Sequence, residues 1–193
     1  MKRLLFLALI AFSTVLNAQK NTILLQGSIN YYNQKGEYSS DQSSNSIGFS
    51  PKIGYQFNSN WTLGVESSFS NYKYSSTNSE FTNKQFTAGV FVRYAKPLND
   101  LFTFYSDLGI GYQDYYRTQN DSNNLLLHFN SKGYYTSFTP AVLMNIGKGF
   151  GLNFNIGGMR YSQNNNALSP YGKSNFYFTF GNYYAIGISK NFK

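Results

Sequence analysis

Cysteine is absent from this 193-residue chain, histidine and tryptophan occur once each, and charged residues make up only 12% of it. Without cysteine there is no disulfide framework and no thiol for a lipoprotein anchor. A single histidine leaves a transition-metal site without its usual ligands, so we expect no metal and no cofactor. Helix-forming Ala, Leu, Glu and Lys are also scarce. The fold must therefore be held by its backbone hydrogen bonds and its surroundings.

A long membrane-spanning apolar run is missing as well. The apolar run from Leu4 to Leu16 is shorter than the 18 or so residues that a transmembrane helix needs. It follows Lys2 and Arg3 and stops just before Ala18, which is the layout of a secretory signal peptide. We predict a signal peptide over residues 1–18 and a single mature domain over 19–193. The mature chain is expected outside the cytoplasm.

Alternation of apolar and polar residues is what the chain has in abundance. Tyr and Phe occur 18 times each, and aromatic residues make up 19% of the chain, which favours strands. Successive side chains of a strand point to opposite faces, so each alternating segment has one apolar and one polar face. Most of the segments have the length that a tilted strand needs to cross a bilayer. There are eight of them, at residues 22–32, 46–57, 61–72, 85–96, 101–113, 134–146, 150–161 and 176–192.

The connections between these segments alternate in length. Short turns are expected at 58–60, 97–100 and 147–149, and long loops rich in Ser, Asn and Gln at 33–45, 73–84, 114–133 and 162–175. This alternation is typical of outer-membrane barrels, which carry their long loops outside the cell. Backbone groups in hydrocarbon must be satisfied internally, which only a closed barrel achieves for strands. We therefore predict an all-β fold, an eight-stranded antiparallel up-and-down transmembrane β-barrel with apolar residues facing lipid and polar residues inside.

The last segment has a motif of its own. It reads NYYAIGISKNFK, with Tyr184, Ile186, Ile188 and Phe192 on the apolar face and Lys190 interrupting it. Together with the signal peptide and the eight segments, it resembles the small outer-membrane barrels of the outer membrane protein X type and the transmembrane domain of outer membrane protein A. The form is similar to the outer membrane protein beta-barrel proteins of the Bacteroidetes. The resemblance implies the outer membrane of a Gram-negative bacterium and a final strand that is read by the barrel-assembly machinery.

Four charged residues lie in mid-strand on the polar face. Pairing the segments around the turn at 58–60 puts Lys52 opposite Glu66, and pairing around the next turn is compatible with Arg93 opposite Asp107. A slip of one residue would turn these charges to lipid, at roughly 2–4 kcal/mol for each Lys or Arg. We predict a charge network across four strands in the lumen. An eight-stranded barrel has room inside for little more than its own side chains, so the lumen should be plugged.

Two prolines stand in the middle of predicted strands. Pro51 and Pro140 each lack the backbone N–H that a strand ladder uses. We expect a bulge or locally weak pairing at both positions.

An apolar cluster occupies the third long loop, where water is expected. We interpret it as a hairpin that continues the flanking strands and offers an edge for strand addition by another chain. Packing over the barrel mouth or contact with lipopolysaccharide are the alternatives. The cluster consists of Leu125, Leu126, Leu127, His128 and Phe129.

The predicted function is structural or surface-interacting, and not enzymatic. A narrow porin-like channel or carrier is one alternative, with the charge network as its gate. A lipid A-modifying enzyme is another, in which His128 would act with nearby Ser131 and Asp121, although no G-x-S-x-G motif occurs. The formal net charge of +8 fits anionic lipid head groups better than nucleic acid for an exported chain. Expected partners are outer-membrane lipid, lipopolysaccharide, the assembly machinery and an extracellular surface partner, with the chain as a monomer.

Overall fold

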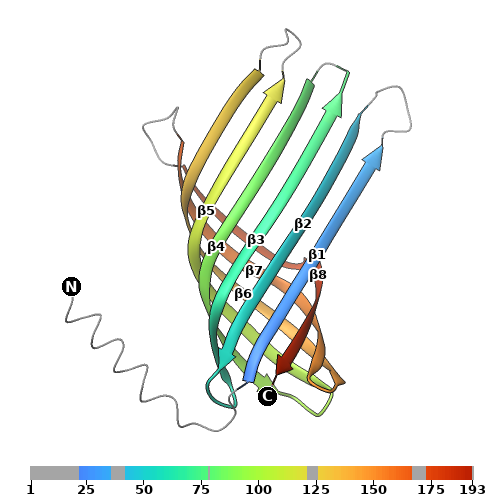
Figure 1. Ribbon diagram of the computed structural model, residues 1–193, viewed down its shortest axis with the longest axis vertical. Coiled ribbons are helices and arrows are strands. Elements are labelled where there is room, and N and C mark those ends of the chain that lie inside the picture. The colour runs from blue at the N-terminus through green and yellow to red at the C-terminus, as the bar shows by residue number, and fades with distance from the viewer. Residues whose placement is uncertain (1–21, 36–41, 78, 121–125, 167–172, 193) are drawn as a thin grey trace, which may run out of the picture.

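The computed structural model describes residues 22–35, 42–77, 79–120, 126–166 and 173–192. They form eight strands, each paired antiparallel with the next, and the last pairs with the first (Figure 1). The predicted all-β, closed, eight-stranded antiparallel barrel is confirmed, and the predicted signal peptide lies outside the described residues. No helix in these ranges has the length and apolar character needed to cross a membrane. The strands are β1 (Thr22–Lys35), β2 (Ser43–Gln56), β3 (Trp61–Ser76), β4 (Ser79–Pro97), β5 (Phe102–Asn120), β6 (Leu126–Gly147), β7 (Phe150–Asn166) and β8 (Lys173–Phe192).

The two faces of the barrel wall differ in the predicted sense. Ile29, Ile110 and Ile186 on the outer face are 72%, 61% and 60% exposed. Buried residues include the charged Arg93 and Asp107, at 5% and 4% exposure. The barrel is therefore apolar outside and polar inside, the reverse of a water-soluble fold.

The strands are longer than predicted at one end of the barrel. Residues 73–84 and 114–133, predicted as long loops, are mostly strand: β3 and β4 pair up to Ser76 and Ser79, and β5 and β6 pair up to Asn120 and Leu126. Polar residues lie on both faces of these extensions, so apolar alternation cannot mark them. The backbone ladder nevertheless continues, and we call this end the hairpin end. The opposite end, with the turns at 57–60, 98–101 and 147–149, is the short-turn end.

The turn between β6 and β7 is the tightest of these connections. Gly147, Lys148 and Gly149 all have positive φ, at 95°, 52° and 79°. Glycine adopts such angles without steric cost, which explains its presence on both sides of Lys148. The turn thus reverses the chain within three residues.

Both prolines disturb the ladder as predicted. Between β2 and β3, pairing stops after Phe49 and resumes at Lys52 in the same register, leaving Pro51 unpaired on that side. Between β6 and β7, the register shifts by a bulge between Phe138 and Ala141, the stretch that contains Pro140. In both cases the proline lacks the N–H that the ladder would need.

The closing seam of the barrel is short. β1 pairs with β8 only from Ile23–Phe192 to Ser28–Gly187, although β1 pairs with β2 along its whole length. The β7–β8 register also shifts between Asn155 and Gly157. In Figure 1 the end of β8 runs beside the start of β1, while the earlier part of β8 bends away from it.

Candidate functional site

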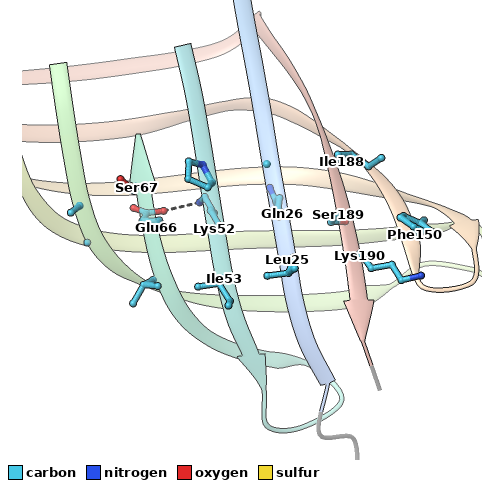
Figure 2. Close-up of a pocket in the computed structure, with 15 residues that line it drawn as sticks. Leu25, Gln26, Lys52, Ile53, Glu66, Ser67, Phe150, Ile188, Ser189 and Lys190 are labelled. Carbon is cyan, nitrogen blue, oxygen red and sulfur yellow. Dashed lines mark ion pairs between the residues drawn. The ribbon is translucent and has the colours of Figure 1, made fainter. Parts of the chain in front are cut away.

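The four predicted lumen charges meet at the short-turn end of the barrel. The Lys52 Nζ lies 2.7 Å from the Glu66 Oε2 and 2.9 Å from the Asp107 Oδ2. The Arg93 guanidinium donates to both Asp107 oxygens, from Nε at 2.7 Å and from Nη2 at 2.9 Å. Lys52 stands opposite Glu66 and Arg93 opposite Asp107 in the strand register. Figure 2 shows the ammonium of Lys52 and the carboxylate of Glu66 facing each other from β2 and β3.

Contacts across the lumen complete this network, and sequence reasoning did not find them. The Arg93 Nη2 donates to the Gln26 Oε1 at 2.7 Å, and the Arg93 guanidinium lies 3.8 Å above the ring of Tyr105. The Tyr135 hydroxyl donates to the Glu66 Oε1 at 2.8 Å. Gln26 on β1 and Tyr135 on β6 contact strands that are not their neighbours, whereas Tyr105 lies on β5, beside the β4 strand of Arg93. The sequence indicated these contacts only in that each residue is polar or aromatic and lies on the predicted inner face.

The network is electrically balanced. Two cations face two carboxylates, and Arg93 and Asp107 form a bidentate pair, the strongest geometry for such a contact. Charges buried in this way are tolerable only when each is paired and hydrogen-bonded. Each charge of the set thus has a partner of opposite sign within it, and we call the set of Lys52, Glu66, Arg93 and Asp107 the ionic plug.

Beyond the plug, toward the hairpin end, the lumen holds two cavities among side chains that include the fully buried Gln113. A cavity starts at Glu66 and is lined by hydroxyl and amide side chains together with Arg160. A second cavity continues it toward the mouth, lined by Tyr115, Arg117 and Lys173 among others. Both cavities thus lie on the hairpin side of the plug. The hydroxyl and amide lining of the deeper cavity comprises Ser50, Ser67, Ser68, Thr87, Ser137, Thr139, Asn155, Tyr177 and Thr179.

The predicted apolar cluster lies at the start of β6. Leu126, Leu127, His128 and Phe129 pair with the end of β5, so the predicted hairpin is present. Leu125 lies outside the described residues. The His128 Nδ1 is 2.8 Å from the Tyr116 hydroxyl, and the two rings stack with centroids 5.9 Å apart.

The hypothetical catalytic set at His128 does not assemble. Ser131 lines the lumen, whereas His128, an odd number of positions away on the same strand, is exposed on the other face of β6. Asp121 lies outside the described residues. Within the described ranges, no group of three His, Cys, Asp or Glu residues could hold a metal ion.

No family model matches the chain, and no curated protein matches it in sequence. Solved structures do match. The outer membrane protein OprG from Pseudomonas aeruginosa is 10% identical with a TM-score of 0.52, covering 91% of this chain and 97% of that one. Neisserial surface protein A is 10% identical with a TM-score of 0.51, covering 90% and 98%. The chain has the fold of a small outer-membrane barrel. The attachment invasion locus protein Ail of Yersinia pestis also matches, at 14% identity and a TM-score of 0.48, covering 90% and 100%.

The last strand of this small barrel carries the predicted assembly motif. Ile186, Ile188 and Phe192 are exposed on the outer face, and the side chain of Tyr184 lies outside the described part of the chain. Lys190 interrupts this apolar face, but its ammonium group points away from the apolar band toward the turn between β6 and β7. Its Nζ donates to the Lys148 carbonyl oxygen at 3.0 Å and lies 3.8 Å from the Phe150 ring, and Figure 2 shows the two side chains together. The aliphatic stem thus covers the wall while the ammonium reaches the turn.

Proposed function

We propose that this protein is an integral outer-membrane barrel of a Gram-negative bacterium, exported by its signal peptide, monomeric and without enzymatic activity. The proposal extends to the outer membrane protein X-like class in its Bacteroidetes form. The observation that carries it is the inverted barrel wall, with Ile29 and Ile110 exposed and Arg93 and Asp107 buried. A soluble protein could not keep so large an apolar surface in water. Lipid is the solvent that this surface fits.

The role we propose for the hairpin end is interaction at the cell surface. The β5–β6 hairpin presents Leu126, Leu127 and the His128–Tyr116 pair on an exposed sheet. Phe129 belongs to the same hairpin. Such a sheet offers apolar contacts and backbone groups to an extracellular protein or to lipopolysaccharide. The final strand would be read by the assembly machinery during insertion through Ile186, Ile188, Phe192 and the preceding Tyr184.

A narrow channel is the second candidate, because cavities occur in the lumen between the mouth and Glu66. The ionic plug argues against a channel, because its paired side chains stand in the path of a solute. A lipid A-modifying activity is weaker still, since His128 and Ser131 lie on opposite faces of β6. We therefore propose a barrel whose bore is closed at the short-turn end.

Single cysteines test the membrane orientation directly, because the chain has none of its own. Phe49→Cys lies on the outer face and Ser50→Cys on the inner face of the same strand, one residue apart. A membrane-confined thiol reagent is expected to label Phe49→Cys much faster than Ser50→Cys. Equal labelling, or the reverse preference, would refute an apolar outer wall in contact with lipid. Migration on gels with and without heating verifies that both variants are folded.

A further inference from the structure

A groove in the outer wall lies where the apolar band meets the polar strand extensions of the hairpin end. It has a volume of about 590 Å³ and crosses β2 to β6, of which β2 to β5 lie side by side in Figure 1. The strand register orders its outward side chains in two rows. The lower row consists of Phe49, Phe69 and Phe86 and ends at Asp114. The upper row, two residues nearer the hairpin end, consists of Ile47, Asn71, Lys84, Tyr116 and Asn130.

The lower row of the groove is suited to hydrocarbon. Phe49, Phe69 and Phe86 are 47%, 49% and 38% exposed on the outer face. Phe69 and Phe86 pack against each other in a tilted arrangement, with ring centroids 5.0 Å apart. Aromatic rings at one level of an apolar wall are typical of the depth at which an outer-membrane barrel passes from hydrocarbon to head groups. The groove therefore offers its lower row to an acyl chain and its upper row to a head group.

Asp114, at the end of the lower row, lacks a partner of opposite charge. It is half-buried, and its Oδ1 is buried without a hydrogen-bond partner. Lys132 stands directly opposite on β6, but among the described residues neither Lys132 nor Lys84 forms an ion pair with Asp114. An ionised group beside the hydrocarbon region is costly unless it is paired. The groove thus presents a carboxylate that a cation from outside the chain would compensate.

Lys84 supplies the opposite charge in the upper row. It is exposed, and it lies two positions along β4 from Phe86, the residue directly opposite Asp114. Such diagonal neighbours are about 7–8 Å apart, so Lys84 and Asp114 can contact two ends of one head group. Tyr116 stands opposite Lys84 and is held by the hydrogen bond between its hydroxyl and the His128 Nδ1. A cation and an anion at this separation are complementary to a zwitterion, whereas a purely anionic ligand would meet the Asp114 carboxylate.

We propose that this groove binds one phospholipid whose head group carries both a phosphate and a primary ammonium. The ammonium donates to the Asp114 carboxylate, the phosphate accepts from Lys84, and an acyl chain packs on Phe69 and Phe86. The inference rests on the proposed outer-membrane placement of the wall and names the lipid that this face selects. A primary ammonium is required because it donates hydrogen bonds to a carboxylate, whereas a quaternary ammonium has the charge but no N–H.

Brominated lipids test this site, because bromine atoms quench a tryptophan that they contact. Trp61 is the only tryptophan and lies on the outer wall at the short-turn end, and the double substitution Trp61→Phe/Phe69→Trp moves the reporter into the groove. In a phosphatidylcholine bilayer, dibrominated phosphatidylethanolamine should quench the groove reporter as if enriched about threefold over dibrominated phosphatidylcholine at the same mole fraction. Trp61 of the unmodified protein should be quenched equally by both. Equal quenching in the groove, or stronger quenching by dibrominated phosphatidylglycerol, overturns the proposal.

Charge variants in the reporter background assign the two head-group contacts. Asp114→Asn should remove the preference for phosphatidylethanolamine over phosphatidylcholine, because the ammonium loses its carboxylate. Lys84→Gln should lower quenching by both lipids about threefold relative to dibrominated diacylglycerol, which has no phosphate. Asp100→Asn removes an exposed carboxylate at the short-turn end and should leave the preference unchanged. A preference that survives Asp114→Asn, or unchanged quenching in Lys84→Gln, overturns the proposal, and gel migration with and without heating verifies folding.

Lipopolysaccharide without phosphoethanolamine is the competing occupant of the same face. It should not displace dibrominated phosphatidylethanolamine from the groove reporter, and displacement would assign the groove to sugar phosphates and overturn the proposal. Membrane labelling of Phe49→Cys distinguishes a failure of this site from a failure of the proposed outer-membrane placement. Absence of any lipid preference with labelling intact refutes the site alone, whereas absence of labelling refutes the placement.

Discussion

At the residue scale, the stability of the barrel depends on buried charges that form ion pairs with one another. Asp107 accepts from both Arg93 and Lys52, so it holds the plug together across the lumen. Removal of one member of such a set leaves a buried charge without compensation, which costs far more than the intact set contributes. Loss of the Asp107 carboxylate is consequently expected to destabilise the barrel strongly.

Asp107→Asn is expected to destabilise the folded barrel by about 3–5 kcal/mol, because Arg93 then lacks its carboxylate. The matched control is Glu80→Gln, which removes the exposed Lys73–Glu80 pair at the hairpin end, with Glu80 at 44% exposure. It should cost less than about 1 kcal/mol. Urea unfolding in lipid vesicles, followed by gel migration, measures both variants. A cost for Asp107→Asn no larger than that for Glu80→Gln would contradict a buried network.

The same residues mark how far sequence reasoning reaches. The alternation of inward and outward positions, together with the position of each turn, was sufficient to predict the pairs Lys52–Glu66 and Arg93–Asp107. The register of two neighbouring antiparallel strands can be counted from the turn that joins them. The contact from Lys52 to Asp107 crosses the lumen between β2 and β5. Its formation depends on barrel closure and strand tilt, which no local pattern encodes.

At the scale of the element, the strands are of two kinds. Their membrane-level parts alternate between apolar and polar residues and were located from sequence. Their extensions at the hairpin end, such as residues 73–76 and 79–84, lack a continuous apolar face and were predicted as loops. Cross-strand contacts hold them instead, among them Tyr74 stacked on Phe81 at 5.0 Å. Solvent on both sides removes the periodic signal but not the hydrogen-bond ladder.

Shortening the β5–β6 hairpin tests whether these extensions are separable from the barrel. Arg117 and Phe129 are direct partners, so Thr118 through His128 can be replaced by an Asn-Gly turn. The shortened protein should refold and keep its heat-modifiable migration, because the removed ladder lies outside the apolar band. The control is a deletion within the apolar band. Removal of one residue near Val90 should prevent folding, because it shifts the register of the strand. Failure of the shortened hairpin alone to refold would show that the extension nucleates the barrel.

At the scale of the whole molecule, the barrel is asymmetric along its axis. At the short-turn end β1 pairs with β8 and the four charges of the plug face the interior, whereas toward the hairpin end the described parts of β1 and β8 form no pairs and the lumen holds cavities. Alternation in the sequence predicted the closed fold and the inward position of the four charges. It could not predict that β1–β8 pairing ends at Ser28–Gly187, or that the β7–β8 register shifts between Asn155 and Gly157, where Gly157 has a φ of 133°. Neither irregularity changes the apolar alternation from which the strands were located.

This asymmetry makes a definite prediction for ion conduction. The unmodified protein should be silent in planar bilayers, because ions entering from the mouth meet the Arg93–Asp107 pair, at 6% and 5% side-chain exposure. Arg93→Ala removes the guanidinium that packs on Tyr105 and binds Gln26, and small conducting events should then appear. Arg117→Ala removes an equal charge near the mouth, above the plug, and should stay silent. Gel migration verifies insertion of both variants. Steady conductance of the unmodified protein, unchanged in Arg93→Ala, would mean that ions pass the barrel by a route that the plug does not control.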